Sequence, residues 1–258
     1  MSTEFDIWQT AADLSSRGEP FVMVTVIATK GSTPRDAGAR MIWRPTHGFS
    51  GTVGGGQFEL LALSSAERHY RDKSRGVEHF VLGAEAEQCC GGTMDVFYEF
   101  CGPSHRLVIF GAGHVAQALA IALRSAPLEI VIADDRPQWN TGDRFPRCRR
   151  VLDYAEAIAI ATEKSASTLA CVMTCSHDTD YELLARLLKA PPAFLGLIGS
   201  RSKRACLFRK LVASGIDEGA VQRIHCPIGL GDMGKHPELI AISMAGQLLL
   251  EAQKLATL

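Results

Sequence analysis

A run of β-prone apolar residues stops abruptly in a glycine turn at residues 107–116, which read LVIFGAGHVA. The pattern predicts a strand, a tight turn and a helix, because β-branched and aromatic residues favour strands and glycine permits the φ angles of a sharp turn. Gly111, Gly113 and Ala116 match the G-x-G-x-x-G/A spacing at the first strand–helix junction of dinucleotide-binding folds. This junction restricts the C-terminal part of the chain to an α/β architecture.

The glycine turn has two interpretations. In a binding role, Gly113 lets a phosphate approach the backbone, and the helix that begins near His114 offers unpaired N–H groups to the anion. In a packing role, the glycines only let the helix lie close to the strand. The next strand-like run ends at Asp134 and Asp135, about 20 residues further on, where such folds place a ribose-binding carboxylate. Together with Arg136, these residues favour a nucleotide-type site.

From residue 106 onward, strand-like and helix-like segments alternate. After the glycine turn, strands are predicted at 128–133, 149–152, 168–174 and 193–198, and helices at 154–163, 181–190 and 203–213. Alternation of this kind predicts a doubly wound parallel sheet with helices on both faces, that is, a Rossmann-like domain. Polar segments follow four of the predicted strands, at residues 111–114, 134–136, 174–180 and 199–203. Because the carboxyl ends of parallel strands meet at one edge of a sheet, we expect these segments to form a common binding rim.

Two of these segments carry candidate functional side chains. Residues 199–201 are Gly199, Ser200 and Arg201, which suit an anionic ligand at a helix N-terminus. His177 and Asp180, three residues apart, are candidates for a catalytic acid/base pair. The alternative is a solvated histidine and a carboxylate that caps the following helix.

The N-terminal part of the chain has a different pattern. It predicts an opening helix at residues 4–17 and strands at 21–28, 39–43, 77–82 and 94–100, interrupted by one further helix that ends near residue 70. These elements predict a smaller α+β domain. Residues 102–104, Gly-Pro-Ser, form the predicted linker, so we expect domains at 1–102 and 103–258.

Two loops of this N-terminal domain carry candidate ligands. Gly54, Gly55 and Gly56 stand at a helix entrance, where exposed N–H groups suit an anion. Glu59 lies in the first turn of that helix, either as a ligand or as a complement to the helix dipole. Cys90 precedes two glycines. It is either a half-buried thiol or a functional one, that is, a soft sulfur ligand or a sulfur-transfer thiol.

Composition excludes some classes of protein. The chain has 258 residues, is 47% hydrophobic and has a net charge of −1, so no excess of positive charge directs it to nucleic acid or an anionic membrane. The apolar run at residues 21–28 is too short to span a bilayer, and residues 1–17 lack the pattern of a signal peptide. The eight cysteines contain no C-x-x-C pair. We expect reduced thiols and a cytoplasmic protein.

The chain closes with a helix that is predicted to begin at Pro237. Its apolar stripe is expected to pack in the core and consists of Ile240, Ala241, Met244, Ala245, Leu248 and Leu249. Gly246 interrupts this helix at a cost of about 1 kcal/mol relative to alanine, which indicates close packing against another element.

Several motifs taken in order resemble those of the XdhC family, the xanthine dehydrogenase accessory proteins. They are KGSTPR at 30–35, GTVGGG at 51–56 with Glu59, Cys90-Gly91-Gly92, GAGHV at 111–115, DDR at 134–136, His177 with Asp180, GLIGSR at 196–201 and PIGL at 227–230. The chain departs from the family pattern at His236, where the family usually has threonine, and at Gly246-Gln247, where it has a glutamate.

The resemblance implies an accessory protein or chaperone. Such a protein binds molybdenum cofactor (molybdopterin), protects it while its sulfido ligand is introduced, and delivers it to a xanthine dehydrogenase-type molybdenum hydroxylase. On this interpretation the glycine turns and residues 199–201 hold the pterin and its phosphate, and Cys90 faces the molybdenum as a metal ligand. A cysteine desulfurase and a second copy of the chain, in a homo-oligomer such as a dimer, are the other expected partners.

The alternative function is that of an NAD(P)-dependent oxidoreductase acting on a small substrate. Asp134 or Asp135 would then bind a ribose, and His177 with Asp180 would exchange protons. A maturation factor without a net reaction of its own is the favoured interpretation. The sequence leaves open whether the rim holds molybdopterin, NAD(P) or another nucleotide.

Overall fold

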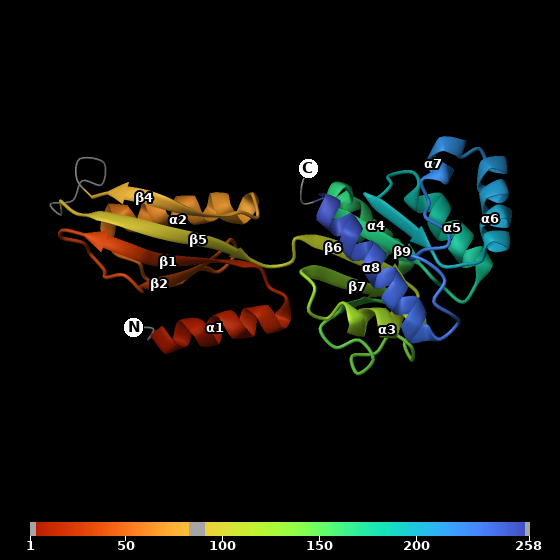
Figure 1. Cartoon of the computed structure of the whole chain (residues 1–258), viewed down its shortest axis with the longest axis horizontal. Coiled ribbons are helices and arrows are strands. Elements are labelled where there is room, and N and C mark those ends of the chain that lie inside the picture. The colour runs from red at the N-terminus through yellow and green to blue at the C-terminus, as the bar shows by residue number, and fades with distance from the viewer. Residues whose placement is uncertain (1–3, 83–90, 256–258) are drawn as a thin grey trace. The chain divides into compact units, whose positions relative to one another are not determined.

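The computed structural model describes residues 4–82 and 91–255 of the chain (Figure 1). Their contacts divide the chain into two compact units, Met1–Gly102 and Pro103–Leu258. Across these described residues, no helix combines the length and the apolar character needed to cross a membrane.

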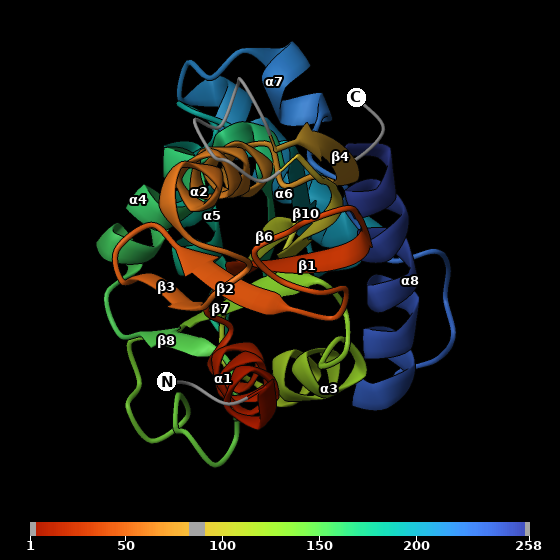
Figure 2. The same ribbon diagram turned by 90° about the vertical axis from the view of Figure 1, so that its left-hand side faces the viewer.

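The N-terminal unit is built on one antiparallel sheet. Its five strands have the order β3-β2-β1-β5-β4. Helices α1 and α2 lie on opposite faces of this sheet (Figure 2), where they cover separate apolar clusters. The elements are α1 (Glu4–Arg17), β1 (Phe21–Lys30), β2 (Arg40–Arg44), β3 (Gly48–Gly51), α2 (Gly56–Arg71), β4 (Arg75–Val81) and β5 (Thr93–Cys101).

The C-terminal unit is built on a parallel sheet with the strand order β10-β9-β6-β7-β8. Its strands are β6 (His105–Phe110), β7 (Leu128–Ala133), β8 (Arg149–Val151), β9 (Thr168–Val172) and β10 (Phe194–Leu197). Counted within the unit, this is the doubly wound order 3-2-1-4-5, and the direction of winding reverses between β6 and β9. Ligands of such sheets bind at this switch point.

Helices cover both faces of the parallel sheet. One face packs against α3 (His114–Ala122) and α8 (Pro237–Leu255), and the other against α4 (Tyr154–Glu163), α5 (His177–Leu187) and α6 (Arg201–Ala213). Two short helices, η1 (Ser165–Ser167) and α7 (Glu218–Gln222), complete the unit. The predicted fold class, a smaller α+β region followed by a Rossmann-like doubly wound sheet, is confirmed.

Several element boundaries differ from the sequence prediction. Strand β3 and helix α7 were not predicted, because β3 has the weakly β-prone sequence GFSG and owes its conformation to pairing with β2. Helix α5 begins at His177 because Ser176 caps it by accepting the Thr179 N–H at 3.3 Å. Leu249, predicted to be in the core, is 42% exposed, because α8 buries the stripe through Met244 and Leu248 instead.

Close packing at Gly246 is confirmed. A Cβ at this position would lie 2.6 Å from Leu230 Cδ1, so the loop that precedes α8 packs closely on the helix here. Gly111 is a position that requires glycine. Its φ is +113°, and a Cβ would lie 2.5 Å from the Met173 carbonyl oxygen at the end of β9. The strand–helix junction and the neighbouring strand therefore fit together only without a side chain.

Replacing Gly111 with alanine should lower the free energy of unfolding by about 1 to 3 kcal/mol or more, because the left-handed φ is strained for a residue with a Cβ and the carbonyl of Met173 must move. Chemical unfolding followed by circular dichroism measures the effect. Gly231→Ala is a matched control, since a Cβ there meets nothing within 4 Å. Equal losses in both variants would contradict the steric explanation.

Candidate functional site

The first turn of α3 is open at the glycine turn. Gly113 is the N-cap residue, in an extended conformation and without a side-chain cap. A Cβ at Gly113 would meet nothing within 4 Å, so the space beside this N-cap residue is open. The first N–H groups of a helix have no partner within the helix, and together with the positive end of the helix dipole they suit an anion at this open position.

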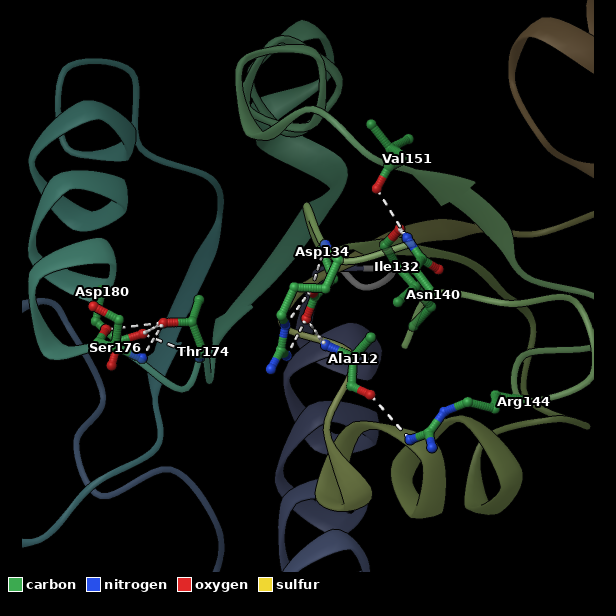
Figure 3. A network of polar contacts seen from close by, with 10 residues as sticks. Ala112, Ile132, Asp134, Asn140, Arg144, Val151, Thr174, Ser176 and Asp180 are labelled. Carbon is green, nitrogen blue, oxygen red and sulfur yellow. Dashed lines mark hydrogen bonds and ion pairs between the residues drawn. The ribbon is translucent and has the colours of Figure 1, made fainter. Parts of the chain in front are cut away.

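The Asp134 carboxylate lies beneath this turn and is fully buried. It accepts hydrogen bonds from the Ala112 N–H at 2.7 Å and the Arg136 N–H at 3.0 Å (Figure 3). The Arg136 guanidinium adds two more, with Nε at 2.8 Å and Nη2 at 2.7 Å. Both carboxylate oxygens are thus engaged inside the protein, whereas the neighbouring Asp135 is exposed and lines a separate cleft of about 270 Å³.

These contacts hold Asp134 in its charged form. Burial alone would raise the pKa of this carboxyl, but the hydrogen bonds from the Arg136 side chain and from the amides of Ala112 and Arg136 outweigh burial, and the pKa is lowered. The ion pair of Asp134 with Arg136 also means that this guanidinium is partly committed before any ligand arrives.

Arg144 holds the following peptide group of the same turn. Its Nη2 donates to the Ala112 carbonyl oxygen at 3.1 Å (Figure 3), so Ala112 is fixed at both its N–H and its C=O. The Arg144 guanidinium lies 4.7 Å from the ring centre of Trp139, and Arg136 lies 5.2 Å from it. The His114 ring packs edge-on against the same indole, with centroids 5.4 Å apart.

Sequence reasoning missed Trp139 and Arg144. They lie in the long connection between β7 and β8, beyond the motif at residues 134–136. An available signal was the presence of a tryptophan in a turn-rich polar segment, since a large aromatic side chain needs a packing partner. Asn140 anchors this connection by donating from Nδ2 to the carbonyl oxygens of Ile132, at 3.2 Å, and Val151, at 2.9 Å (Figure 3).

A second buried carboxylate organises the ends of β9 and β10. Asp180 is fully buried and accepts from the Thr174 N–H at 3.0 Å and the Thr174 hydroxyl at 2.7 Å. Its other oxygen accepts from Lys203 Nζ at 2.5 Å, and Lys203 also donates to the Ile198 carbonyl oxygen at 3.0 Å. These bonds commit Asp180 to Thr174 and Lys203, while His177 is exposed in the first turn of α5.

Residues 199–201 lie at the entrance of α6. Ser200 caps this helix by accepting the Lys203 N–H at 3.2 Å, and Arg201 is exposed. A cleft of about 670 Å³ opens beside them, between the α6 entrance, the connection at residues 227–235 and the residues Ile240 and Ser243 of α8. This volume is that of a small-molecule site.

In the N-terminal unit, three of the sequence motifs lie close together: residues 30–35, the triple-glycine turn at 54–56 and Gly91-Gly92. A Cβ on Gly92 would lie 2.3 Å from the Ser32 carbonyl oxygen, so the segment after Cys90 packs directly on residues 30–35. A Cβ on Gly54 would lie 3.0 Å from Pro34 Cγ, which brings the triple-glycine turn to the same loop. Cys90 itself, with Cys89, lies outside the described residues.

The triple-glycine turn leads into α2. Gly55 is the N-cap residue, without a side-chain cap, and Gly56 begins the helix. Glu59 lies in the first turn, as predicted, and its Oε1 is 2.5 Å from the Thr52 hydroxyl. Within residues 4–82 and 91–255, no group of three or more His, Cys, Asp and Glu side chains is placed to hold a metal ion.

The chain was compared with models of known protein families, and two of them match it. The XdhC Rossmann domain matches residues 107–248, which is more than half of the chain, and the XdhC and CoxI family matches residues 14–81. The chain belongs to the XdhC family. This membership confirms the resemblance read from the motifs.

Three curated proteins resemble this XdhC chain. The uncharacterized protein YqeB of Escherichia coli (strain K12) is 32% identical over 95% of this chain and 46% of its own length. A protein of Bacillus subtilis (strain 168) described as a probable xanthine dehydrogenase subunit is 24% identical over 64% of this chain and 48% of its own. The molybdenum cofactor insertion chaperone PaoD of E. coli (strain K12) is 22% identical over 93% and 86%. The chain spans about half the length of the first two relatives.

One solved structure shares the fold of this XdhC chain. A protein of Bacillus halodurans described as a xanthine dehydrogenase superposes with a TM-score of 0.50, at 20% identity, over 98% of this chain and 96% of its own. The likeness supports the Rossmann-type parallel sheet and the smaller unit before it.

Asp134→Asn should lower the free energy of unfolding at neutral pH by about 1.5 to 3 kcal/mol, because it removes the charge from a buried hydrogen-bonded group. The folded-state pKa lies below that of an unfolded aspartate, about 3.9. The stabilisation is therefore complete above that pH and is lost as the pH falls through the folded-state pKa.

Denaturant unfolding at a series of pH values tests this expectation. The gap between the natural protein and Asp134→Asn should stay constant from about pH 7 to pH 5 and narrow below about pH 4. The exposed neighbour supplies a matched control, Asp135→Asn, which should change stability by less than about 0.5 kcal/mol. A gap that widens in acid would refute the assigned role of Asp134.

Proposed function

We propose that this chain is a maturation factor for xanthine dehydrogenase-type molybdenum hydroxylases, which binds molybdenum cofactor and delivers it to the enzyme. Membership of the XdhC family supports this function. Two relatives add support, since one is named as a molybdenum cofactor insertion chaperone and the other as a probable part of a xanthine dehydrogenase.

The open entrance of α3 at the switch point is the observation that carries the proposal. Molybdopterin bears a phosphate, and an uncapped helix N-terminus with free space in front of it suits that group. His114 and Arg144 lie at the same place and supply further donors. Ser200 and Arg201 extend the anion-binding rim at the entrance of α6.

The surroundings of the acidic residue that would bind a ribose favour a cofactor carrier over the alternative function, an NAD(P)-dependent oxidoreductase. A nicotinamide dinucleotide needs an acceptor for a ribose hydroxyl at the end of the second strand. Asp134 occupies that position, but both of its oxygens are engaged by Ala112 and Arg136. The exposed Asp135 lines a separate cleft with residues of α4 and α5. A phosphate needs donors instead, and donors are what the rim retains.

The N-terminal unit is proposed to supply a thiol ligand for the cofactor. When bound, the cofactor supplies a molybdenum centre whose terminal sulfido ligand the hydroxylase requires. Cys90 is proposed to face this metal as a thiolate, since thiolates bind soft and sulfur-bearing metal centres. The packing of Gly92 on Ser32 fixes the chain directly after this residue.

The finer parts of the function follow from the same proposal. The protein would shield the cofactor while the sulfido ligand is introduced and would receive that sulfur from a cysteine desulfurase. It would act as a homo-oligomer, such as a dimer, and would catalyse no net reaction of its own. Retention of isolated molybdenum cofactor by the purified protein, compared with retention of NAD, tests the central claim. Retention of NAD alone would refute it.

Gly113→Val should weaken cofactor retention by about tenfold or more while the protein stays folded, because the branched side chain fills the space in front of α3. Retention after gel filtration measures the effect. Ala159→Val, on the exposed side of α4, is the control for inserting a branched residue. Unchanged retention in a folded Gly113→Val protein would remove α3 from the site.

Cys90→Ala should reduce cofactor retention and the activation of a cofactor-free hydroxylase, whereas Cys89→Ala should leave both unchanged. In the sequence, Cys90 adjoins Gly91 and Gly92 and so has little side-chain bulk beside it, whereas Cys89 follows Gln88. Equal behaviour of the two variants would overturn the assignment of Cys90.

A further inference from the structure

The cleft beside α6 has walls and a rim of different chemistry. Ile198, Ile228 and Ile240 form apolar walls, and Met233 also lines the cleft. Arg201 and Lys235 bring two cations to it. Asp232 brings a carboxylate to the same cleft. Mostly apolar walls with a few polar groups are typical of sites for small planar ligands.

The connection that closes this cleft is fixed to α8. The Ser243 hydroxyl donates to the Gly231 carbonyl oxygen at 2.8 Å and lies 3.2 Å from the Gly231 nitrogen, from which it accepts. Gln247 Oε1 accepts from the Gly229 N–H at 2.6 Å. The cleft wall is therefore a built part of the fold, and Gln247, one of the departures from the family pattern, holds it in place.

Asp232 is positioned by its own turn. Its Oδ1 accepts from the Gly234 N–H at 2.9 Å, which fixes the carboxyl group relative to the backbone. A carboxylate has about four acceptor sites, so this bond leaves Asp232 able to accept from a ligand. Two adjacent N–H donors on a planar heterocycle are the natural complement of such a group.

The cleft lies next to the entrance of α3. Helix α8 carries Ile240 in the cleft wall, and its first turn carries Glu238. The same helix packs against α3 in one apolar cluster on this face of the sheet. A ligand seated in the cleft can therefore extend along α8 toward the glycine turn.

We propose that this cleft binds the pterin ring of the cofactor, with Asp232 accepting hydrogen bonds from the 2-amino group and the adjacent ring N–H. The apolar walls enclose the ring, and the phosphate-bearing side of the ligand extends toward α3. This assignment rests on the proposed function. It names a 2-amino-4-oxopteridine as the class of ligand that the connection at residues 227–235 selects.

Free pteridines test the cleft without metal, phosphate or client enzyme. The probes are 6-hydroxymethylpterin and lumazine, a pteridine that carries an oxo group where pterin has the 2-amino group. Fluorescence titration should give binding of 6-hydroxymethylpterin by the full chain and about tenfold or more weaker binding of lumazine, as expected for loss of hydrogen bonds to a charged acceptor. Equal affinities, or no binding of either compound, would overturn the proposal.

Two variants test the residues. Asp232→Asn keeps an acceptor for the Gly234 N–H, so the turn survives, but it should weaken pterin binding about tenfold and abolish the preference over lumazine. Gly231→Val places a side chain in open space at the cleft and should prevent binding of both compounds. Glu218→Gln, which removes an exposed carboxylate in α7, is the matched control. Pterin binding that survives both cleft variants would overturn the assignment.

Comparing pterin binding with retention of whole cofactor distinguishes a failure of the cleft assignment from a failure of the proposed function. A protein that retains whole molybdenum cofactor but binds no free pterin refutes the cleft assignment alone. A protein that binds pterin through Asp232 but retains no cofactor supports the cleft and refutes the proposed function.

Discussion

The buried carboxylate of Asp134 is the interaction on which the C-terminal site depends. It joins the glycine turn, through Ala112, to the end of the neighbouring strand, and Arg136 balances its charge. Arg144 holds the carbonyl group of the same residue, Ala112. A buried charge without these partners would cost several kcal/mol. The turn is consequently fixed before a ligand arrives, so binding need not order the backbone.

A second buried, ion-paired carboxylate has the same structural role at the neighbouring strands of the sheet. Asp180 is buried, is balanced by Lys203, and ties the ends of β9 and β10 together. Both carboxylates therefore serve the architecture of the rim, while exposed cationic groups such as Arg201 and Lys235 remain at its surface. These exposed cations suit an anionic ligand.

The alternation of strands and helices, and the family, could be predicted from the sequence. Strand β7 and helix α4 begin and end at the predicted residues, because each has strong local signals at both ends. The roles of Asp134 and Asp135 could not be predicted, since the two are identical in type and adjacent. Only the position of the Ala112 amide and the Arg136 side chain decides which is buried. Trp139 was missed for a related reason, because its partners are distant in sequence or lie in an irregular loop.

Trp139 also gives the C-terminal unit an optical property. The chain has three tryptophans, and Trp139 alone falls within residues 103–258. Its indole is in contact with His114, Arg136 and Arg144 at the glycine turn. Indole emission depends on the local electric field, and an anion at this turn opposes the field of the surrounding cations. The unit therefore carries a built-in fluorophore at the entrance of α3, whose colour and intensity depend on what occupies it.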